Sequence, residues 1–151
     1  MASQPPASSG PGRTLAWALG AGGALPFLAL ALAPLAGPVP DWAWPALVGY
    51  GALILSFLGG IRWGRALGHR ERRAADLDLL ASVLPSLYAW PLLLVPSGQA
   101  LPLLAAGFAG QWLLDERRRQ PPAPSWFLPL RRALSATVIA ALLLAGAVHP
   151  V

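Results

Sequence analysis

The chain has 151 residues, of which 56% are hydrophobic and 11% are charged, and its formal net charge is +5. Soluble domains carry about 25% charged residues, so this composition excludes an ordinary soluble domain and indicates an integral membrane protein. The basic residues flank apolar stretches and do not line one face, which argues against a nucleic-acid-binding surface. The chain has no cysteine, which excludes disulfides and thiolate metal sites.

Five apolar stretches follow one another along the chain, and a membrane-crossing helix needs roughly 20 apolar residues. We therefore predict an all-α bundle of five transmembrane helices, forming a single domain over residues 14–149, after a disordered tail at 1–13 rich in proline, serine and glycine. A cleavable signal peptide is the alternative for the first stretch, but that stretch exceeds the usual length of about 7 to 15 residues. The predicted spans cover residues 14–36, 42–61, 77–95, 99–114 and 130–148.

The fourth of these spans is short. At about 1.5 Å per residue it covers only about 24 Å, so its full crossing requires local thinning of the bilayer or a longer helix. A re-entrant fourth segment is the alternative, but it would place Arg117 on the same side as the arginine-free third loop. We therefore keep five crossings.

The orientation follows from the arginines, which supply all eleven basic residues. They precede the first span or lie in the second and fourth loops, so five crossings put them all on one side. The positive-inside rule then places the N-terminus in the cytoplasm and the C-terminus outside. Arginine without lysine, together with abundant alanine, proline and glycine, suggests a bacterial source, so we expect a bacterial inner membrane. The arginines are Arg13, Arg62, Arg65, Arg70, Arg72, Arg73, Arg117, Arg118, Arg119, Arg131 and Arg132.

A stripe of small residues runs along the second span at spacings of three and four. Small side chains let helix backbones approach closely in lipid, so we interpret the stripe as a helix-packing seam. A ligand contact is the alternative. The stripe consists of Gly49, Ala52, Ser56, Gly60 and Gly64.

Several polar side chains share one depth near the cytoplasmic boundary and form a candidate ligand-binding layer. Arg62 is the sharpest member, because an arginine at this level can hold a phosphate or carboxylate with two parallel hydrogen bonds. Two arrangements are open to Arg62, which either extends its charge toward the aqueous boundary or pairs with Asp115 across the bundle. The alternatives are a charge that only sets topology, serines that bond to their own helix, and a glutamine that only links helices. The candidate ligand-binding residues are Ser56, Arg62, Ser82, Ser86, Gln111 and Asp115.

Catalytic and metal-binding patterns do not support an enzyme. His69 and His149 are predicted on opposite sides of the membrane, so they cannot share one site. The sequence has no HExxH, GxSxG or Walker pattern. The run from Asp115 to Arg119 is most simply a solvated helix end that neutralises its own charge. We expect no catalytic residue, no metal and no cofactor.

Several segments carry a family resemblance. They are Tyr50-Gly51-Ala52, the run from Leu55 to Gly64, the run from Ser82 to Leu87, Gln111-Trp112 with Asp115 and Arg117, Trp126-Phe127, and Leu130-Arg131. In these segments the chain resembles a bacterial integral-membrane domain-of-unknown-function family related to the mitochondrial transmembrane protein 69 of animals. The resemblance implies a protein of the bacterial or mitochondrial inner membrane, and it brings no activity.

The expected function is therefore that of an uncharacterised multi-pass inner-membrane protein acting as a non-enzymatic interaction or assembly partner of another membrane component. The alternative is a small-molecule or lipid-binding carrier that uses the polar layer around Arg62. The expected partners are membrane lipids and either a membrane protein or further copies of this chain, with no nucleic acid.

Overall fold

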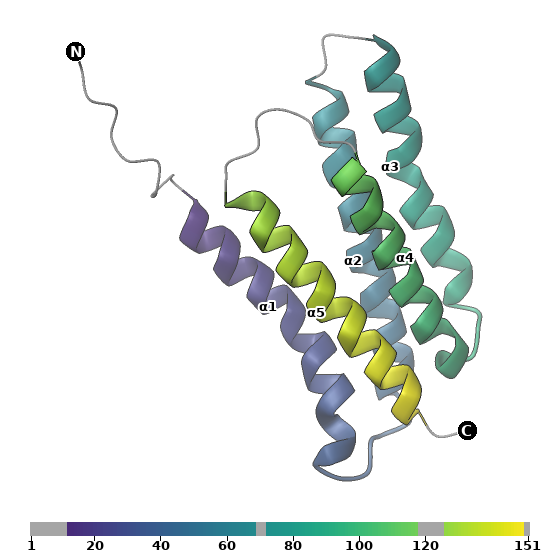
Figure 1. The fold of residues 1–151 in the computed structure, drawn as a ribbon. Coiled ribbons are helices and arrows are strands. Elements are labelled where there is room, and N and C mark those ends of the chain that lie inside the picture. The colour runs from purple at the N-terminus through teal and green to yellow at the C-terminus, as the bar shows by residue number, and fades with distance from the viewer. Residues whose placement is uncertain (1–11, 69–71, 118–125, 150–151) are drawn as a thin grey trace, which may run out of the picture.

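The computed structural model describes residues 12–68, 72–117 and 126–149, and these residues form a helical bundle (Figure 1). The predicted all-helical fold is confirmed. The predicted tail falls largely outside the described residues, and Arg13 is already the first residue of the first helix. The helices are α1 (Arg13–Leu32), the short 3₁₀ helix η1 (Ala33–Leu35), α2 (Ala43–Ala66), α3 (Arg72–Leu92), α4 (Ser97–Arg117) and α5 (Phe127–Val148).

Three of the helical segments are long and apolar enough to cross a membrane, namely Arg13–Leu35, Ala43–Gly64 and Phe127–Val148. The helix α4 is longer than predicted, and its 21 residues span about 31 Å at about 1.5 Å per residue. The helix α3 begins with Arg72 and Arg73, five residues before the predicted span. The remaining two helices therefore have sufficient length, but their ends are more polar.

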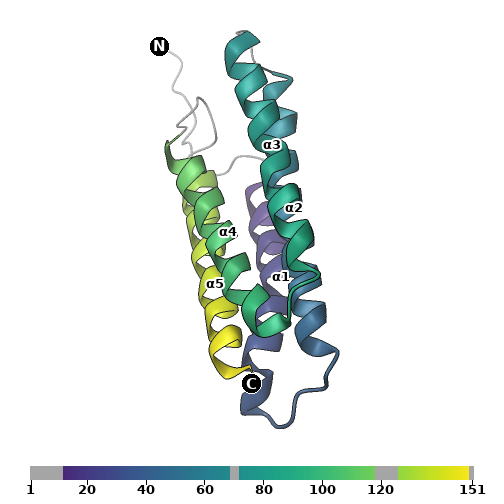
Figure 2. The same ribbon diagram turned by 90° about the vertical axis from the view of Figure 1, so that its right-hand side faces the viewer.

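Consecutive helices run in opposite directions, as short connections favour. In Figures 1 and 2, α2 lies beside α3 and α4 lies beside α5. The helix α1 packs mainly on α5 and more lightly on α2. At the end of the bundle where α1 begins, the pair of α1 and α5 leans away from the other three helices (Figure 1).

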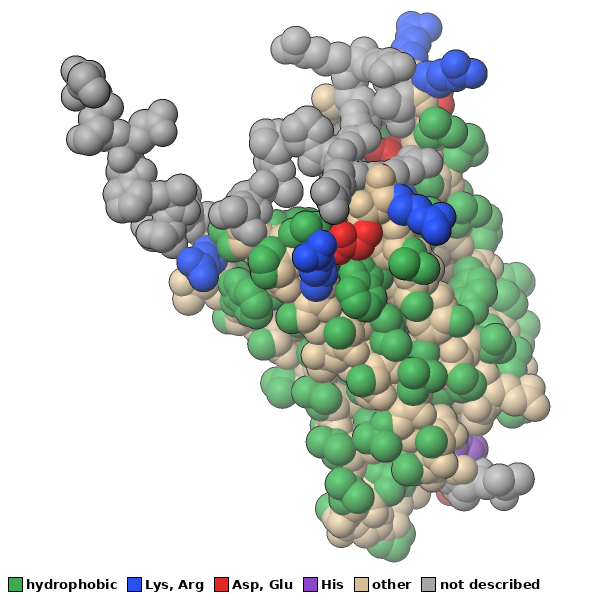
Figure 3. Space-filling view, viewed as in Figure 1, with side chains coloured by type: hydrophobic (Ala, Val, Ile, Leu, Met, Phe, Trp, Pro, Cys, Tyr) green, Lys and Arg blue, Asp and Glu red, His purple; other side chains and the backbone are tan. Residues whose placement is uncertain are grey.

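Charged side chains gather at one end of the bundle (Figure 3). This end, called the arginine-rich end below, is where α1, α3 and α5 begin and where α2 and α4 end. Asp41 and His149 lie at the opposite end. The long surface between the two ends is covered by exposed leucine, tryptophan and phenylalanine side chains, as expected for a surface that faces lipid.

All five α-helices contribute to the core, which includes Phe27, Leu47, Leu104 and Leu142, none of which is exposed. Phe27 packs against Tyr50 at 5.1 Å and edge-to-face against Phe108 at 5.9 Å between ring centroids. Such arrangements suit the charge distribution of aromatic rings.

Glycines set the closest helix contacts. A Cβ placed on Gly59 would collide with the backbone carbonyl oxygen of Ser82, so this glycine lets α2 and α3 approach each other. A Cβ on Gly107 would lie 2.7 Å from the Tyr88 ring and 2.8 Å from Leu55.

Most of the predicted stripe of small residues does not pack against another described helix. Ala52 is buried in the core, but a Cβ on Gly49, Gly60 or Gly64 would meet no atom within 4 Å. Within the described chain, these three glycines therefore do not form the seam, and Gly59 makes the contact expected of Gly60. As a surface for another molecule, the stripe stays a prediction.

Candidate functional site

Asp115 is the centre of an ion cluster that joins three helices at the arginine-rich end. The Asp115 Oδ1 atom accepts a hydrogen bond from Arg62 Nη2 at 2.8 Å. Its Oδ2 atom accepts two hydrogen bonds from Arg131, from Nε at 3.0 Å and from Nη2 at 2.7 Å. Gln111, one turn earlier on α4, approaches Oδ1 with its Nε2 at 3.5 Å. Of the two arrangements open to Arg62, the structure has the pairing with Asp115.

The chain brings these residues together because each lies near an end of its helix. Arg62 is in the last turns of α2, Asp115 is near the end of α4, and Arg131 is in the second turn of α5. Antiparallel helices of similar length place these positions at the same depth. The side chains are shielded to different degrees, with exposed fractions of 1% for Arg62, 13% for Arg131 and 15% for Asp115.

Arg62 is only partly satisfied by this pairing. Its Nε and Nη1 atoms are buried and have no hydrogen-bond partner among the residues that the structure describes. An unsatisfied buried donor costs roughly 1–3 kcal/mol, and more when the group is charged. Arg62 therefore depends on Asp115 for its stability inside the bundle.

A second ion pair lies on the outer side of the cluster. Arg132 binds Glu116 through Nε at 2.5 Å and Nη2 at 2.8 Å, and Trp112 Nε1 lies 3.4 Å from the same carboxylate. Asp115 and Glu116 thus bind arginines of α5. This corrects the interpretation of the run from Asp115 to Arg119 as a solvated helix end that neutralises its own charge. Arg118 and Arg119 lie outside the described residues.

The predicted polar layer separates into two groups. Arg62, Gln111 and Asp115 come together as described above. The Ser56 hydroxyl donates to the Ala52 carbonyl at 2.9 Å, and the Ser82 hydroxyl donates to the Leu79 carbonyl at 2.6 Å, so both bond to their own helices. Ser86 is half-buried on α3.

Sequence reasoning placed Ser135 at the depth of the polar layer, but it did not include Ser135 or Arg131 among the candidate ligand-binding residues. Arg131 was interpreted only as a charge that sets topology. The available signal was their spacing, because residues four apart on a helix share one face. One face of α5 thus presents a guanidinium followed by a hydroxyl.

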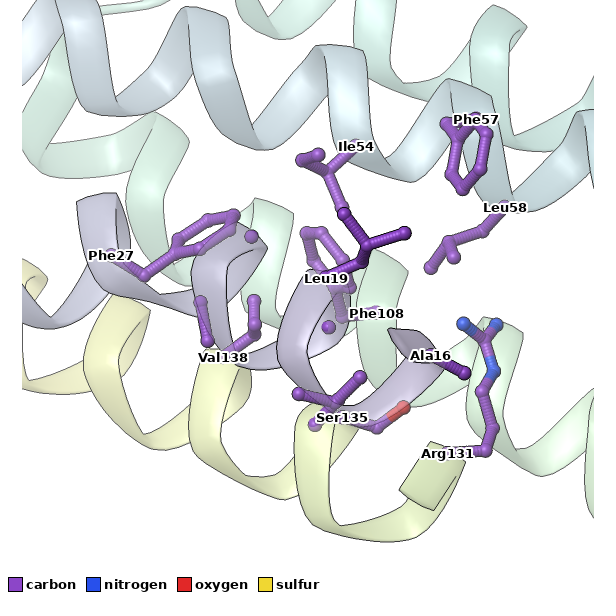
Figure 4. Close-up of a pocket in the computed structure, with 14 residues that line it drawn as sticks. Ala16, Leu19, Phe27, Ile54, Phe57, Leu58, Phe108, Arg131, Ser135 and Val138 are labelled. Atoms are coloured by element: carbon purple, nitrogen blue, oxygen red, sulfur yellow. The ribbon is translucent and has the colours of Figure 1, made fainter. Parts of the chain in front are cut away.

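An apolar pocket of about 380 Å³ lies between α1, α2, α4 and α5 (Figure 4). Its volume falls in the range of about 300–1,000 Å³ typical of small-molecule sites. Phe27 and Val138 line one end, and Arg131 stands at the other (Figure 4). Because α1 and α5 lean away from α2 at the arginine-rich end, their side chains do not close this space.

The pocket opens between α1 and α2 toward the apolar surface of the bundle. Leu19 of α1 and Phe57 of α2 both line it, yet they are 67% and 65% exposed. Gly20 and Gly23 of α1 also line it, and Gly23 leaves open space at its Cβ position. A molecule dissolved in the bilayer can therefore enter from the side without crossing a polar surface.

Residues 12–147 match the model of a family described as a protein of unknown function, DUF3429. This chain belongs to that family. The matched range contains the whole ion cluster and every pocket-lining residue that the structure describes.

Two curated relatives of this chain are named transmembrane protein 69. The protein from Xenopus tropicalis is 38% identical over 137 residues, which cover 85% of this chain and 51% of the relative. The protein from Mus musculus is 38% identical over 85 residues, which cover 54% of this chain and 34% of the relative. The chain thus spans about half or less of their length. No solved structure matches it.

The chain is therefore an integral membrane protein of a family of unknown function. This conclusion rests on the transmembrane relatives and on three helical segments that are apolar enough to cross a bilayer. The predicted family resemblance is confirmed.

Proposed function

We propose that this protein binds a membrane lipid, whose apolar chain occupies the pocket between α1, α2, α4 and α5. The observation that carries the proposal is the pocket itself, which is apolar, of ligand size and open toward the surface that faces lipid. The binding role involves no chemical step by the protein. This is the lipid-binding form of the carrier alternative derived from the sequence.

The proposal includes the topology. In it all five helices cross a bacterial inner membrane, with the arginine-rich end in the cytoplasm and the C-terminus outside. The gathering of charge at one end of the bundle supports this arrangement. The length of α4 supports its full crossing.

The test uses two adjacent glycines of α1. Gly23 lines the pocket, and a Cβ there would meet only Tyr50 Oη, at 3.9 Å. Gly23→Leu should therefore fill pocket space without a backbone collision. Gly22 is exposed, does not line the pocket and has no atom within 4 Å of its Cβ position. Gly22→Leu is thus a matched control with the same change in side chain and helix.

The measurement is native mass spectrometry of the protein released from its own membrane under mild conditions. The wild type and Gly22→Leu should retain a lipid, and Gly23→Leu should retain it at least about tenfold less, which corresponds to about 1.4 kcal/mol. Equal retention by both variants would refute binding in this pocket.

A second function, that of a partner for another membrane protein or for further copies of this chain, is favoured by the outward stripe. Gly49, Gly60 and Gly64 leave open space on α2 where another helix can approach closely. Gly60→Leu should abolish association in cross-linking experiments while leaving the fold intact. An unchanged pattern of cross-linked species would count against this second function.

A further inference from the structure

We infer that the polar end of the pocket binds the headgroup of a lipid with net negative charge, and that Arg131 and Ser135 recognise it. The inference rests on the proposed lipid binding and specifies the chemical class of lipid. It follows from three observations, which concern the unused donors of Arg131, the hydroxyl of Ser135 and the acid-free lining of the pocket.

Arg131 has hydrogen-bonding capacity left over. A guanidinium offers five N–H groups, and Arg131 directs only its Nε and one N–H of Nη2 at Asp115. Its remaining N–H groups make no hydrogen bond to a described residue. Because Arg131 also lines the pocket, these donors are available to a ligand there (Figure 4). Guanidinium groups suit phosphate and carboxylate oxygens in particular.

Ser135 adds a second donor one turn further along α5. Unlike Ser56 and Ser82, it makes no hydrogen bond to its own helix or to another described residue, although the residue is only 5% exposed. It lines the pocket, and its oxygen points toward the Arg131 end in Figure 4. Because Ser135 borders the pocket, its hydroxyl can donate a hydrogen bond to a ligand oxygen there.

The pocket offers a cationic headgroup no counter-charge. None of the described residues that line it is acidic, and the carboxylate of Asp115 is already engaged by Arg62 and Arg131. These three side chains carry two positive charges and one negative charge. An anion beside Arg131 therefore neutralises the net positive charge of these three side chains.

Arg62 and Asp115 act as positioning residues in this scheme. Asp115 holds the Arg131 guanidinium by two hydrogen bonds, and Arg62, which is almost fully buried, holds Asp115. A side chain fixed in advance loses less conformational entropy when it binds a ligand. Arg131 is thus presented to the pocket in one orientation.

The test is a competition between two lipids with identical acyl chains. Purified protein is mixed with equal amounts of dioleoyl phosphatidylglycerol and dioleoyl phosphatidylcholine, and the bound lipids are counted by native mass spectrometry. The wild type should prefer phosphatidylglycerol by about tenfold. Arg131→Gln should lose most of this preference, and Ser135→Ala should reduce it, while both still bind lipid.

Arg132→Gln is the matched control, because Arg132 is the next residue on α5, does not line the pocket and pairs with Glu116. It should keep the preference. If Arg131→Gln folds poorly, Arg131→Gln combined with Arg62→Met and Asp115→Asn removes all three charges of the cluster, leaves no buried charge unpaired and should show the same loss of preference. A preference that survives in these Arg131 variants would overturn the inference.

The remaining outcomes separate the two proposals. Wild-type protein that binds both lipids equally would refute the charge recognition alone, and wild-type protein that retains no lipid would refute the lipid binding itself. Millimolar inorganic phosphate should not displace phosphatidylglycerol. Displacement by phosphate would assign Arg131 to a free anion and overturn the lipid headgroup.

Discussion

Replacing Asp115 by asparagine tests whether the ion cluster stabilises the bundle. The change keeps the shape of the side chain and removes its charge. Arg62 and Arg131 then lose their shared counter-charge, and Arg62, at 1% exposure, cannot reach water without opening the helices. We expect strong destabilisation.

The hydrogen bonds at Asp115 give the magnitude. Three of them have lengths of 2.7 to 3.0 Å and join charged groups. Each loses roughly 1 kcal/mol when the acceptor becomes neutral, so the set contributes about 3 kcal/mol. Removal of one partner from a buried ion pair costs about 3–5 kcal/mol, which agrees. The partial exposure of Asp115 and Arg131 favours the lower value.

Glu116→Gln is the matched control. Glu116 is the next residue, is also paired with an arginine of α5, and lies in a more exposed pair. Exposed ion pairs contribute little, so this variant should unfold almost like the wild type. The double variant Asp115→Asn with Arg62→Met should be at least about 1 kcal/mol more stable than the sum of the two single losses predicts, because neighbouring charges couple.

The assay is equilibrium unfolding in mixed micelles with increasing dodecyl sulfate, followed by far-ultraviolet circular dichroism. A difference of about 3 kcal/mol between Asp115→Asn and Glu116→Gln is expected in the free energy of unfolding. Equal stabilities of these two variants would refute the reasoning that burial makes the Asp115 cluster important.

Two further predictions concern the packing and the topology. Gly59→Ala should destabilise the protein by about 1–2 kcal/mol in the same assay, because the new Cβ collides with the Ser82 carbonyl and this overpacking outweighs the gain in helix propensity. Gly60→Ala has open space at its Cβ and should be neutral or stabilising by up to about 1 kcal/mol. A Gly60→Ala protein less stable than Gly59→Ala would contradict the contact of α2 with α3. Because the chain has no cysteine, Asp41→Cys and Arg73→Cys give single labelling sites at opposite ends of the bundle. An impermeant maleimide added to intact cells should label only Asp41→Cys. Labelling of Arg73→Cys alone would show that the protein has the opposite orientation.

The helices were predictable because each coincides with an apolar run flanked by arginines or turn residues. Their ends were less predictable. The helix α3 begins at Arg72 and not at residue 77, since a helix continues beyond the hydrocarbon region as long as its backbone bonds are satisfied. Hydropathy therefore indicates where apolar residues lie, but it does not show where a helix begins.

The depth of the site residues along the bundle could be predicted from the sequence, whereas the direction in which their side chains point could not. Counting residues from the charged helix ends placed Gln111 in a layer just inside Arg62 and Asp115, and these three residues do meet. The same count placed Ser56 and Ser82 at that level, but their hydroxyls bond to their own helices. Which way a side chain faces depends on helix rotation, and a uniformly apolar span gives no polar face from which to infer it.

The same limit explains the stripe of small residues. Gly59 and Gly60 are neighbours, but only Gly59 faces another helix of the chain. In lipid both faces of α2 are apolar, so spacing alone cannot distinguish an internal contact from a surface. The pocket was equally inaccessible to sequence reasoning, because it arises from the lean of α1 and α5 away from α2.

Photocrosslinking in the membrane tests lipid binding in the pocket most directly. Protein in nanodiscs is irradiated with a phosphatidylglycerol that carries a diazirine on its acyl chain, and the labelled residues are identified by peptide mass spectrometry. The account predicts labels concentrated on pocket residues of α1 and α5, such as Leu19, Phe27 and Val138. Labels spread evenly over the surface that faces lipid, including the exposed Leu80 and Leu87 of α3, would contradict it.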